Sequence, residues 1–522
     1  MKPFLNASVL GLICLGAVAA PDPGGNPFDG GAAPPATAID RLVFARLKQL
    51  GIPPADICSD AVFVRRVHLD VVGTLPSAFE ARQFLRDRTP DKRRALIDRL
   101  LERDEFSDYW AMKWSERLRV KAEFPINLWP NAAQAYHHWI RTRIRQNQPC
   151  DQWVRELLTA SGSNFRVPPV NFYRAMQNRD PAGIAQAVAL TFMGCRAEQW
   201  PSNQLAGMAA FFAQVGYKST AEWKEEIVFF EPGKDTNGLA RAARFPDGTS
   251  ARLAADRDPR EVFADWLVDP KNPWFTRNLA NRVWAWLLGR GIIQEPDDIR
   301  PDNPPANPAL LAYLETELIA SKYELKPLLR QILNSETYQL SCLAKSDRPE
   351  AAANFAFYPL RRLDAEVLID ALNQITGTSE NYSSAIPEPF TFIPESQRAV
   401  ALEDGSISSA FLEMFGRPAR DTGLESERNN RATAEQRLHL LNSSHIQNKI
   451  EQSRMLQFQT QSQKNPREMA TGIYLGILSR LPTPEELEIV DGYFQRASAN
   501  PRQAAADLAW ALVNSAEFLY RH

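Results

Sequence analysis

The chain has 522 residues, of which 44% are hydrophobic and 23% charged, and its formal net charge is −2. A chain of this length can bury large hydrophobic cores, and length alone suggests about three domains. The balanced charge, without long runs of one sign, gives no electrostatic basis for binding nucleic acid or an anionic membrane surface.

Residues 1–20 have the pattern of a secretory signal peptide. Lys2 precedes the apolar run LNASVLGLICLG, and residues 17–19 offer a site for signal cleavage. Because this run is too short to cross a bilayer, we expect no membrane span after cleavage, although an uncleaved anchor is the alternative interpretation. The sequence therefore predicts a secreted or periplasmic protein, in which residues 21–36 form a flexible tether rich in glycine and proline.

Helical periodicity dominates residues 37–215, which we expect to form the first domain. Ile39, Val43 and Leu47 recur at helical spacing, and Ser77-Ala78-Phe79-Glu80 has the form of a capping box at a helix start. Further helical patterns cover residues 59–73, 91–102, 105–120, 132–146, 151–161 and 181–215.

The histidines and cysteines of this part give no metal-binding pattern. His68, His137 and His138 lie inside predicted helices without the carboxylate or cysteine spacing of a metal site, so we interpret them as core or surface residues. The mature chain has four widely spaced cysteines, which could form up to two disulfides or remain as buried thiols: Cys58, Cys150, Cys195 and Cys342.

Residues 216–257 interrupt the helical periodicity. Residues 226–231, EIVFFE, favour a strand, glycine-containing pairs favour turns, and residues 241–245 favour a returning strand. We therefore expect a small β-hairpin insert between two helical halves. The predicted fold class is mainly α, a multi-helical two-domain protein whose second domain spans residues 258–522.

The second domain begins with strong signals for helix starts. An Asp or Asn followed by proline predicts three of them, at Asp258, Asn272 and Asn307. Between the last two, apolar residues at helical spacing predict a buried helix that ends at Gly289.

Polar residues gather on this helix and in the loop that follows it. Asn278 and Arg282 form a polar stripe on the helix, and the loop carries Asp297, Asp298 and Arg300. We expect Arg282 to pair with Asp297 or Asp298 as a buried ion pair that fixes a proline-stiffened loop. The alternative is an aspartate-lined site for a cation or a substrate.

Arg361 and Arg362 are further candidate binding residues. They lead into a predicted helix on which Glu366 and Asp370 lie one turn apart. A carboxylate pair at this spacing can serve acid–base chemistry or hold a cation, but it more often lies on a solvated face or pairs with arginines such as these two.

His445 is the most plausible titrating group if the protein is catalytic. It lies on a predicted helix capped by Thr433, and Glu425 or Glu427 could orient its ring, with Arg428 beside them. The alternative is a structural role, which is the commoner one for a single helical histidine.

Several motifs, in order along the chain, give it a family resemblance. Residues 37–215 resemble the planctomycete-type DUF1549 domain through RRVHLDVVGTLPS, FSDYWAMKWSERLRV and CDQWVRELLTASG. Residues 258–515 are similar to its companion DUF1553 domain through NPWFTRNLANRVWAWLLGRGI, YPLRRLDAEVLIDAL and GILSRLPTPEE. The resemblance implies an exported protein without a settled activity, from a family that often carries cytochrome-c-like modules and is common in bacteria that degrade complex polysaccharides.

The chain departs from this family at two places where relatives carry cysteines. A CxxCH motif often follows the ALTFMGC segment in relatives, whereas residues 196–199 here are Arg-Ala-Glu-Gln, without the second cysteine and the histidine that a c-type haem requires. The family often has a Cys-x-Cys-Glu-Arg run, and this chain has Leu424-Glu425-Ser426-Glu427-Arg428 there, so both cysteines are absent while the last Glu and the Arg remain. We therefore expect no haem, no metal and no other cofactor.

These observations predict an exported, haem-free binding or assembly subunit of an extracytoplasmic complex. Its expected partner is an unknown protein, such as a redox protein, or a polysaccharide. The alternative is a hydrolase that acts on carbohydrate or ester bonds through Asp or Glu residues and His445. The hydrolase interpretation requires the polar candidates to meet in one open cleft. The binding interpretation predicts an aromatic-lined groove or an apolar patch, with those polar candidates buried and paired with one another.

Overall fold

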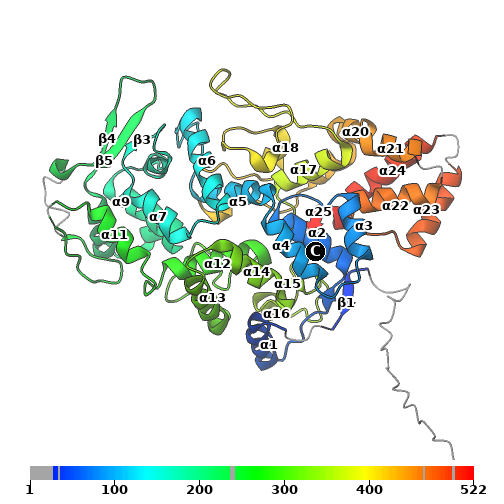
Figure 1. Ribbon diagram of the computed structural model, residues 1–522, viewed down its shortest axis with the longest axis horizontal. Coiled ribbons are helices and arrows are strands. Elements are labelled where there is room, and N and C mark those ends of the chain that lie inside the picture. The colour runs from blue at the N-terminus through cyan, green and yellow to red at the C-terminus, as the bar shows by residue number, and fades with distance from the viewer. Residues whose placement is uncertain (1–26, 33–35, 235–241, 255, 463–464, 497–499) are drawn as a thin grey trace, which may run out of the picture.

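The computed structural model describes residues 27–32, 36–234, 242–254, 256–462, 465–496 and 500–522. Helices make up most of these residues, and the strands form only small sheets, so the predicted mainly α fold class is confirmed (Figure 1). The expected signal peptide and most of the expected tether lie outside the described residues.

The helices of the first half follow the predicted pattern closely. Thr37, Ser59 and Ser77 cap three of them by accepting backbone N–H groups, and the predicted capping box between Ser77 and Glu80 is present. The helices are α1 (Ala38–Leu50), α2 (Asp60–Val71), α3 (Ala78–Arg86), α4 (Lys92–Leu101), α5 (Asp104–Arg117), α6 (Pro130–Arg145), α7 (Cys150–Thr159), α8 (Asn171–Arg174), α9 (Pro181–Val188) and α10 (Ser202–Ala209).

One predicted helix of this half is wrong. The pattern over residues 181–215 predicted a continuous helix, but α9 ends at Val188 and passes through one π turn to Gly194, which has a φ of 65°. A Cβ atom at residue 194 would lie 2.7 Å from Oδ1 of Asn278 and 3.0 Å from the carbonyl of Pro296. Glycine therefore permits both the left-handed turn and the close approach of the second half of the chain.

The predicted strand after residue 225 is present, but its partner differs from the prediction. Strand β5 (Glu226–Phe230) pairs with the preceding strand β4 (Val215–Ser219), and its other edge pairs with β3 (Gly162–Ser163). Of the strand predicted over residues 241–245, residue 241 lies outside the described residues, and the described residues 242–245 do not join this sheet, since Arg244 forms an isolated bridge with Ser250 instead. Two-stranded pairs elsewhere join β1 (Asp29–Gly31) to β2 (Ile57–Cys58) and β6 (Arg361–Arg362) to β7 (Tyr520–Arg521).

The second half is also helical. Asp258 and Asn307 cap helices as predicted, whereas Asn272 accepts N–H groups two and three residues ahead of it and the helix begins only at Phe275. The helices are α11 (Pro259–Leu267), α12 (Phe275–Leu288), α13 (Pro308–Ala320), α14 (Leu325–Leu333), α15 (Glu336–Gln339), α16 (Pro349–Ala353), α17 (Ala365–Thr376), α18 (Ala410–Met414), α19 (Ala434–Asn442), α20 (Ser444–Glu451), α21 (Arg454–Ser462), α22 (Pro466–Ile477), α23 (Pro484–Arg496), α24 (Pro501–Val513) and α25 (Ala516–Leu519).

The helix predicted from Thr433 onward is divided in two. Thr433 caps α19 as expected, but Ser443 ends α19 with an extended backbone and caps α20 through its own side chain. The break turns α20, which carries His445, away from the axis of α19. None of the helices in the described ranges combines the length and hydropathy needed to cross a membrane.

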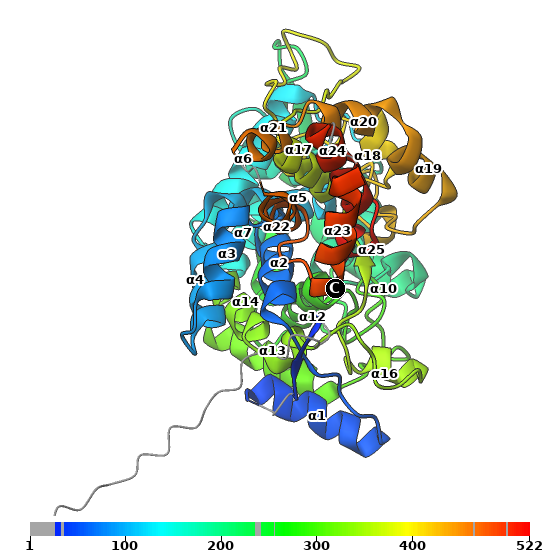
Figure 2. The same cartoon turned by 90° about the vertical axis from the view of Figure 1, so that its right-hand side faces the viewer.

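The two halves share one continuous core. Helix α5 lies across the middle of the molecule, and its Trp110 and Trp114 make edge contacts with Trp286 of α12, at 5.7 Å and 5.5 Å between ring centroids (Figure 1). At the other end, α2 and α3 lie beside α22 (Figure 2). Arg65 and Arg66 of α2, each 1% exposed, donate to backbone carbonyls of the C-terminal helices and to those of Tyr338 and His522.

Candidate functional site

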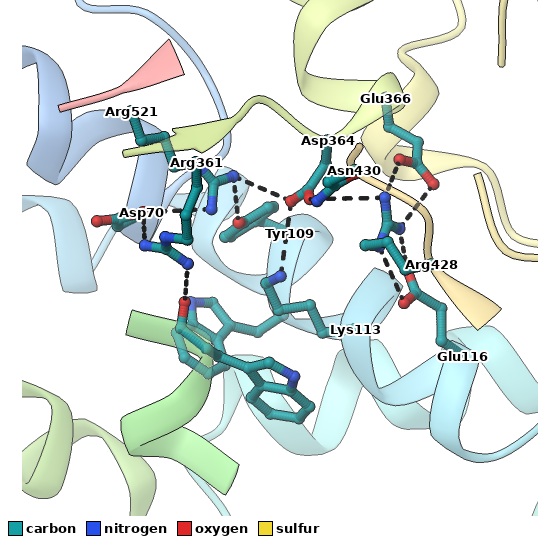
Figure 3. Close-up of polar contacts among 12 residues, drawn as sticks. Asp70, Tyr109, Lys113, Glu116, Arg361, Asp364, Glu366, Arg428, Asn430 and Arg521 are labelled. Atoms are coloured by element: carbon teal, nitrogen blue, oxygen red, sulfur yellow. Dashed lines mark hydrogen bonds and ion pairs between the residues drawn. The ribbon is translucent and has the colours of Figure 1, made fainter. Parts of the chain in front are cut away.

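A cluster of buried charges lies where the two halves meet (Figure 3). Helix α5 contributes Tyr109, Lys113 and Glu116, which share one face because they are spaced three or four residues apart. The second half contributes the rest of the cluster from β6, the start of α17, the segment after Glu427 and β7: Arg361, Asp364, Glu366, Arg428, Asn430 and Arg521.

Arg428 binds a pair of glutamates within this cluster. Its guanidinium donates to Glu366 at 2.8 Å and 3.0 Å and to Glu116 at 2.5 Å. Burial by itself raises the pKa of Glu366, but Arg428 outweighs this effect and holds the pKa below its usual value. Glu116 is also buried, and there burial prevails and raises its pKa. Arg428 is therefore a structural cation, fully engaged by its partners.

Arg521 joins the last strand to the first helices. It donates to Asp364 at 3.0 Å and to the hydroxyl of Tyr109 at 2.9 Å, and it lies 3.4 Å from Asp70 of α2. Asp70 is also 3.7 Å from Arg361 and accepts hydrogen bonds from Tyr338 and Tyr358. These contacts span almost the entire chain, so the cluster fixes the relative position of the two halves.

A second network surrounds Asp297. Its carboxylate lies 2.6 Å from Arg282, 2.7 Å from Arg117 of α5, and 2.6 Å from the backbone N–H of Glu425. The predicted pairing of Arg282 with Asp297 is thus confirmed, and Asn278 accepts a further hydrogen bond from Arg282. Burial alone would raise the pKa of Asp297, but the two arginines hold it well below its usual range. Such an aspartate stays ionised and is no general acid.

The other acidic candidates lie near the surface or accept backbone N–H groups. Glu425 accepts from Arg282 and from the indole of Trp286, each at 3.3 Å. Glu427 accepts the backbone N–H groups of Asp421 and Thr422. Asp298 pairs with Arg300 in the exposed loop and not with Arg282. Arg300 also pairs with Asp302.

His445 lies apart from the charge cluster and from the Asp297 network, and the prediction of its acidic partner is wrong. The acid that contacts His445 is Glu380, at 2.8 Å from Nε2, rather than Glu425 or Glu427. Its Nδ1 lies 3.2 Å from Nε2 of His439, and Glu380 also pairs with Lys449 at 3.2 Å. Glu380 follows α17, and no local sequence pattern predicts a contact between residues 65 positions apart.

Arg361 and Arg362 point to different surroundings, as expected for consecutive residues of a strand. Arg361 lies in the charge cluster and donates to the carbonyls of Trp286 and Leu287. Arg362 donates to carbonyls of Phe415, Asn429 and Asn430. The expected partnership of these arginines with Glu366 and Asp370 is wrong, because Glu366 pairs with Arg428 and Arg417, and Asp370 lies nearest Arg398.

The sequence patterns did not single out most of the charge cluster, including Lys113, Asp364 and Arg521. One signal was available: within the apolar helix FSDYWAMKWSERLRV, the polar residues Tyr109, Lys113, Glu116 and Arg117 fall on a single face. A polar stripe on a helix that is otherwise buried predicts buried partners. Their partners lie 180 or more residues away along the chain, and no sequence signal links them to this helix.

A group of exposed aromatic side chains, which we call the aromatic face, lies on another part of the surface. It consists of the half-buried Trp129 and of four exposed rings, Phe124, Trp223, Phe390 and Phe392, of which Phe124, Trp223 and Phe392 are 84%, 71% and 68% exposed. The rings of Trp129 and Phe390 are 5.3 Å apart, and the ammonium of Lys224 lies over both tryptophans. The tip of the β4–β5 hairpin and the loop after α17 project from the same side of the molecule (Figures 1 and 2).

The described part of the chain contains no cluster of side chains that could hold a metal ion. No three His, Cys, Asp or Glu side chains gather there as a metal site would require. The four cysteines are free thiols, and Cys195 donates to the carbonyl of Ile299 at 3.0 Å.

Two family models match the chain. Residues 38–215 match PSCyt2, a protein of unknown function (DUF1549), and residues 259–494 match PSD1, a protein of unknown function (DUF1553). The resemblance found in the sequence motifs is therefore confirmed. No curated protein and no solved structure matches the chain.

Proposed function

We propose that this chain, which belongs to the family of proteins with DUF1549 and DUF1553 domains, is an exported, haem-free binding subunit that docks on a protein partner through its aromatic face. The observation that carries the proposal is that Trp129, Trp223 and Phe390, from three distant segments, are linked by a ring contact and by Lys224, and that Phe124, Trp223 and Phe392 in these segments are more than two-thirds exposed. Large exposed apolar patches of this kind mark interaction sites in soluble proteins.

The chemistry of the aromatic face favours a protein over a saccharide. Three of its five rings are phenylalanines, which carry no group that could bond to sugar hydroxyls. Aromatic residues are enriched in the centres of protein–protein interfaces, where their burial contributes most of the binding free energy. Charged residues beside the rings, among them Glu123, Glu222 and Lys224, would form the polar rim of such an interface.

The polar candidates support a binding role over hydrolysis. Arg282, Asp297 and Arg428 are paired with other charged groups in the interior, and His445 lies with a separate set of partners. Both ring nitrogens of His445 contact neighbouring side chains, His439 and Glu380, rather than the acidic residues of the charge cluster. Glu425 and Arg428 line one pocket, but His445 lies with other partners, so the acidic candidates and the histidine of the hydrolase interpretation are separate.

A photocrosslinking amino acid at position 392 of the full chain, produced in its own host, tests the proposal. We expect it to crosslink one defined extracytoplasmic protein, and the double variant F124S/W223S to reduce that product at least tenfold. Phe79 of α3 is 74% exposed and gives a matched control, since a crosslinker there should not capture this protein. The purified partner should then bind the wild-type chain and not the double variant.

Three outcomes would contradict the proposal: no crosslinked product at residue 392, the same product at residue 79, or equal binding by the double variant. If no protein partner is found and the chain binds oligosaccharides that the F124S/W223S variant does not bind, the ligand of the aromatic face is a saccharide instead of a protein. Cell fractionation of the full chain and of a variant without residues 1–20 tests export, because the shortened chain should stay in the cytoplasm.

A further inference from the structure

A pocket of about 390 Å³ opens at the charge cluster, between α5, α12 and the β6–β7 strand pair. Both halves of the chain line it, and Lys113, Trp286, Arg361, Glu425, Arg428 and Arg521 are among the lining residues. Small-molecule sites in proteins have volumes of about 300–1,000 Å³, so this pocket has room for a molecule of roughly one ring but not for a polymer. It shares no residue with the aromatic face.

Lys113 is the cation in this pocket that forms no hydrogen bond with the described residues, although it makes a long ion pair with Asp364. Its side chain is 8% exposed, and its nearest carboxylate, Asp364, is 3.7 Å away, which is too long for a hydrogen bond. No acceptor among the described residues forms a hydrogen bond with this ammonium, whose other neighbours are the rings of Tyr109 and Trp286. A buried cation with three unfilled donor positions is costly unless a ligand or water supplies acceptors.

The surrounding arginines have the same deficit. Nε of Arg361 and Nε of Arg521 are buried and have no hydrogen-bond partner in the described part of the chain. Glu116 and Glu366 are held by Arg428, and one oxygen of Asp70 accepts from two tyrosines. Asp364 is held by Arg521 and Asn430, and Glu425 by Arg282 and Trp286. Oδ1 of Asp70, which lies near both arginines, is likewise buried without a hydrogen bond, so these unpaired atoms are enclosed by the protein. Lys113 is therefore the donor of the pocket lining that a ligand can reach, while the lining carboxylates Asp364 and Glu425 are already engaged.

We propose that this pocket binds a small molecule through an oxyanion, a carboxylate, sulfate or phosphate group, with Lys113 as the principal contact. Burial by itself lowers the pKa of Lys113, but Tyr109 and Asp364 outweigh burial and raise it, so the side chain stays protonated. A protonated lysine binds an anion and does not act as a nucleophile.

Isothermal titration calorimetry with acetate, sulfate and phosphate, against chloride at equal ionic strength, tests this site. We expect at least one oxyanion to bind the wild-type chain, and K113M to weaken that binding at least tenfold. Lys121 is a matched control, because it is similarly covered and pairs with Asp421 outside the pocket, so K121M should bind within twofold of wild type. The oxyanion that binds tightest identifies which of the three chemistries the ligand carries.

Two further variants keep the test decisive if K113M folds poorly. K113R retains the charge and should retain binding, whereas L360W places a bulky ring at the half-exposed Leu360 in the pocket lining and should weaken binding. Equal binding by wild type and K113M or L360W, or no oxyanion binding beyond the effect of chloride, would overturn the proposal. F124S/W223S should bind the anion normally, which separates this site from partner docking.

Discussion

At the scale of single residues, buried ion pairs contribute more to the position of chain segments than to chemistry. Asp297 joins α5, α12 and the segment at Glu425 through two arginines and one backbone N–H. Removing one partner of such a group leaves uncompensated charge in the interior, which costs much more than the ion pair itself contributes.

We therefore expect D297N to lower the free energy of unfolding by about 3–5 kcal/mol in urea denaturation at pH 7. The neighbouring D298N is the control, because Asp298 pairs only with Arg300 in an exposed loop and such pairs contribute about 0–1 kcal/mol. The low pKa of Asp297 also means that its contribution is present above the pKa of an unfolded aspartate and is lost as the pH falls. Equal loss in both variants would refute this role.

His137 of α6 presents the opposite case, a buried titratable group without partners. Neither of its ring nitrogens has a hydrogen bond among the described residues, and burial lowers its pKa to about 3. The unfolded chain takes up a proton at this residue below pH 6.5, whereas the folded chain does so only near pH 3. Stability is therefore lost as the pH falls through this window.

We expect H137L to remove this loss, so that its stability relative to wild type improves by about 2 kcal/mol between pH 8 and pH 5. Thermal unfolding at the two pH values measures the difference. The adjacent His138 is exposed, and H138L should show no comparable dependence on pH. A pH-independent effect of H137L would show that shape, and not protonation, determines its contribution.

At the scale of elements, helix starts were predictable because their signals are local. Ser77 and Glu80 form their capping box within four residues, and Arg282 finds Asp297 in the loop directly after its own helix. Helix ends within long apolar patterns were not predictable, because the breaks at Gly194 and Ser443 depend on contacts with other parts of the fold. The close approach of Asn278 to Gly194 is a property of two helices that meet only in three dimensions.

The partners of the candidate residues depend on the same long-range packing. Lys113 meets Asp364, and Arg521 meets Asp70 and Tyr109, at separations that no sequence period encodes. The aromatic face likewise draws on three segments whose exposed rings are individually unremarkable in the sequence. The sequence thus predicted which residue types carry polar and aromatic chemistry, and the fold decides which of them meet.

At the scale of the molecule, the two matched domains are not independent layers around separate cores. Trp286 of α12 packs against Trp110 and Trp114 of α5, and Arg65 and Arg66 of α2 bind carbonyls of the C-terminal half. One hydrophobic cluster runs through both halves. A boundary drawn in the sequence at residues 216–257 therefore divides the family models but not the core.

We accordingly expect the full chain to unfold in a single transition, with tryptophan fluorescence and far-ultraviolet circular dichroism changing together in urea. Residues 38–257 and 258–522 produced separately should each fail to fold, because separation exposes the tryptophan contact and leaves Arg65, Arg66 and Arg117 without their partners. Produced together, the two parts should associate one to one and recover the circular dichroism of the full chain. Cooperative unfolding of either part alone would show that it has a core of its own, and the charge cluster would then be an interface between two domains that fold separately.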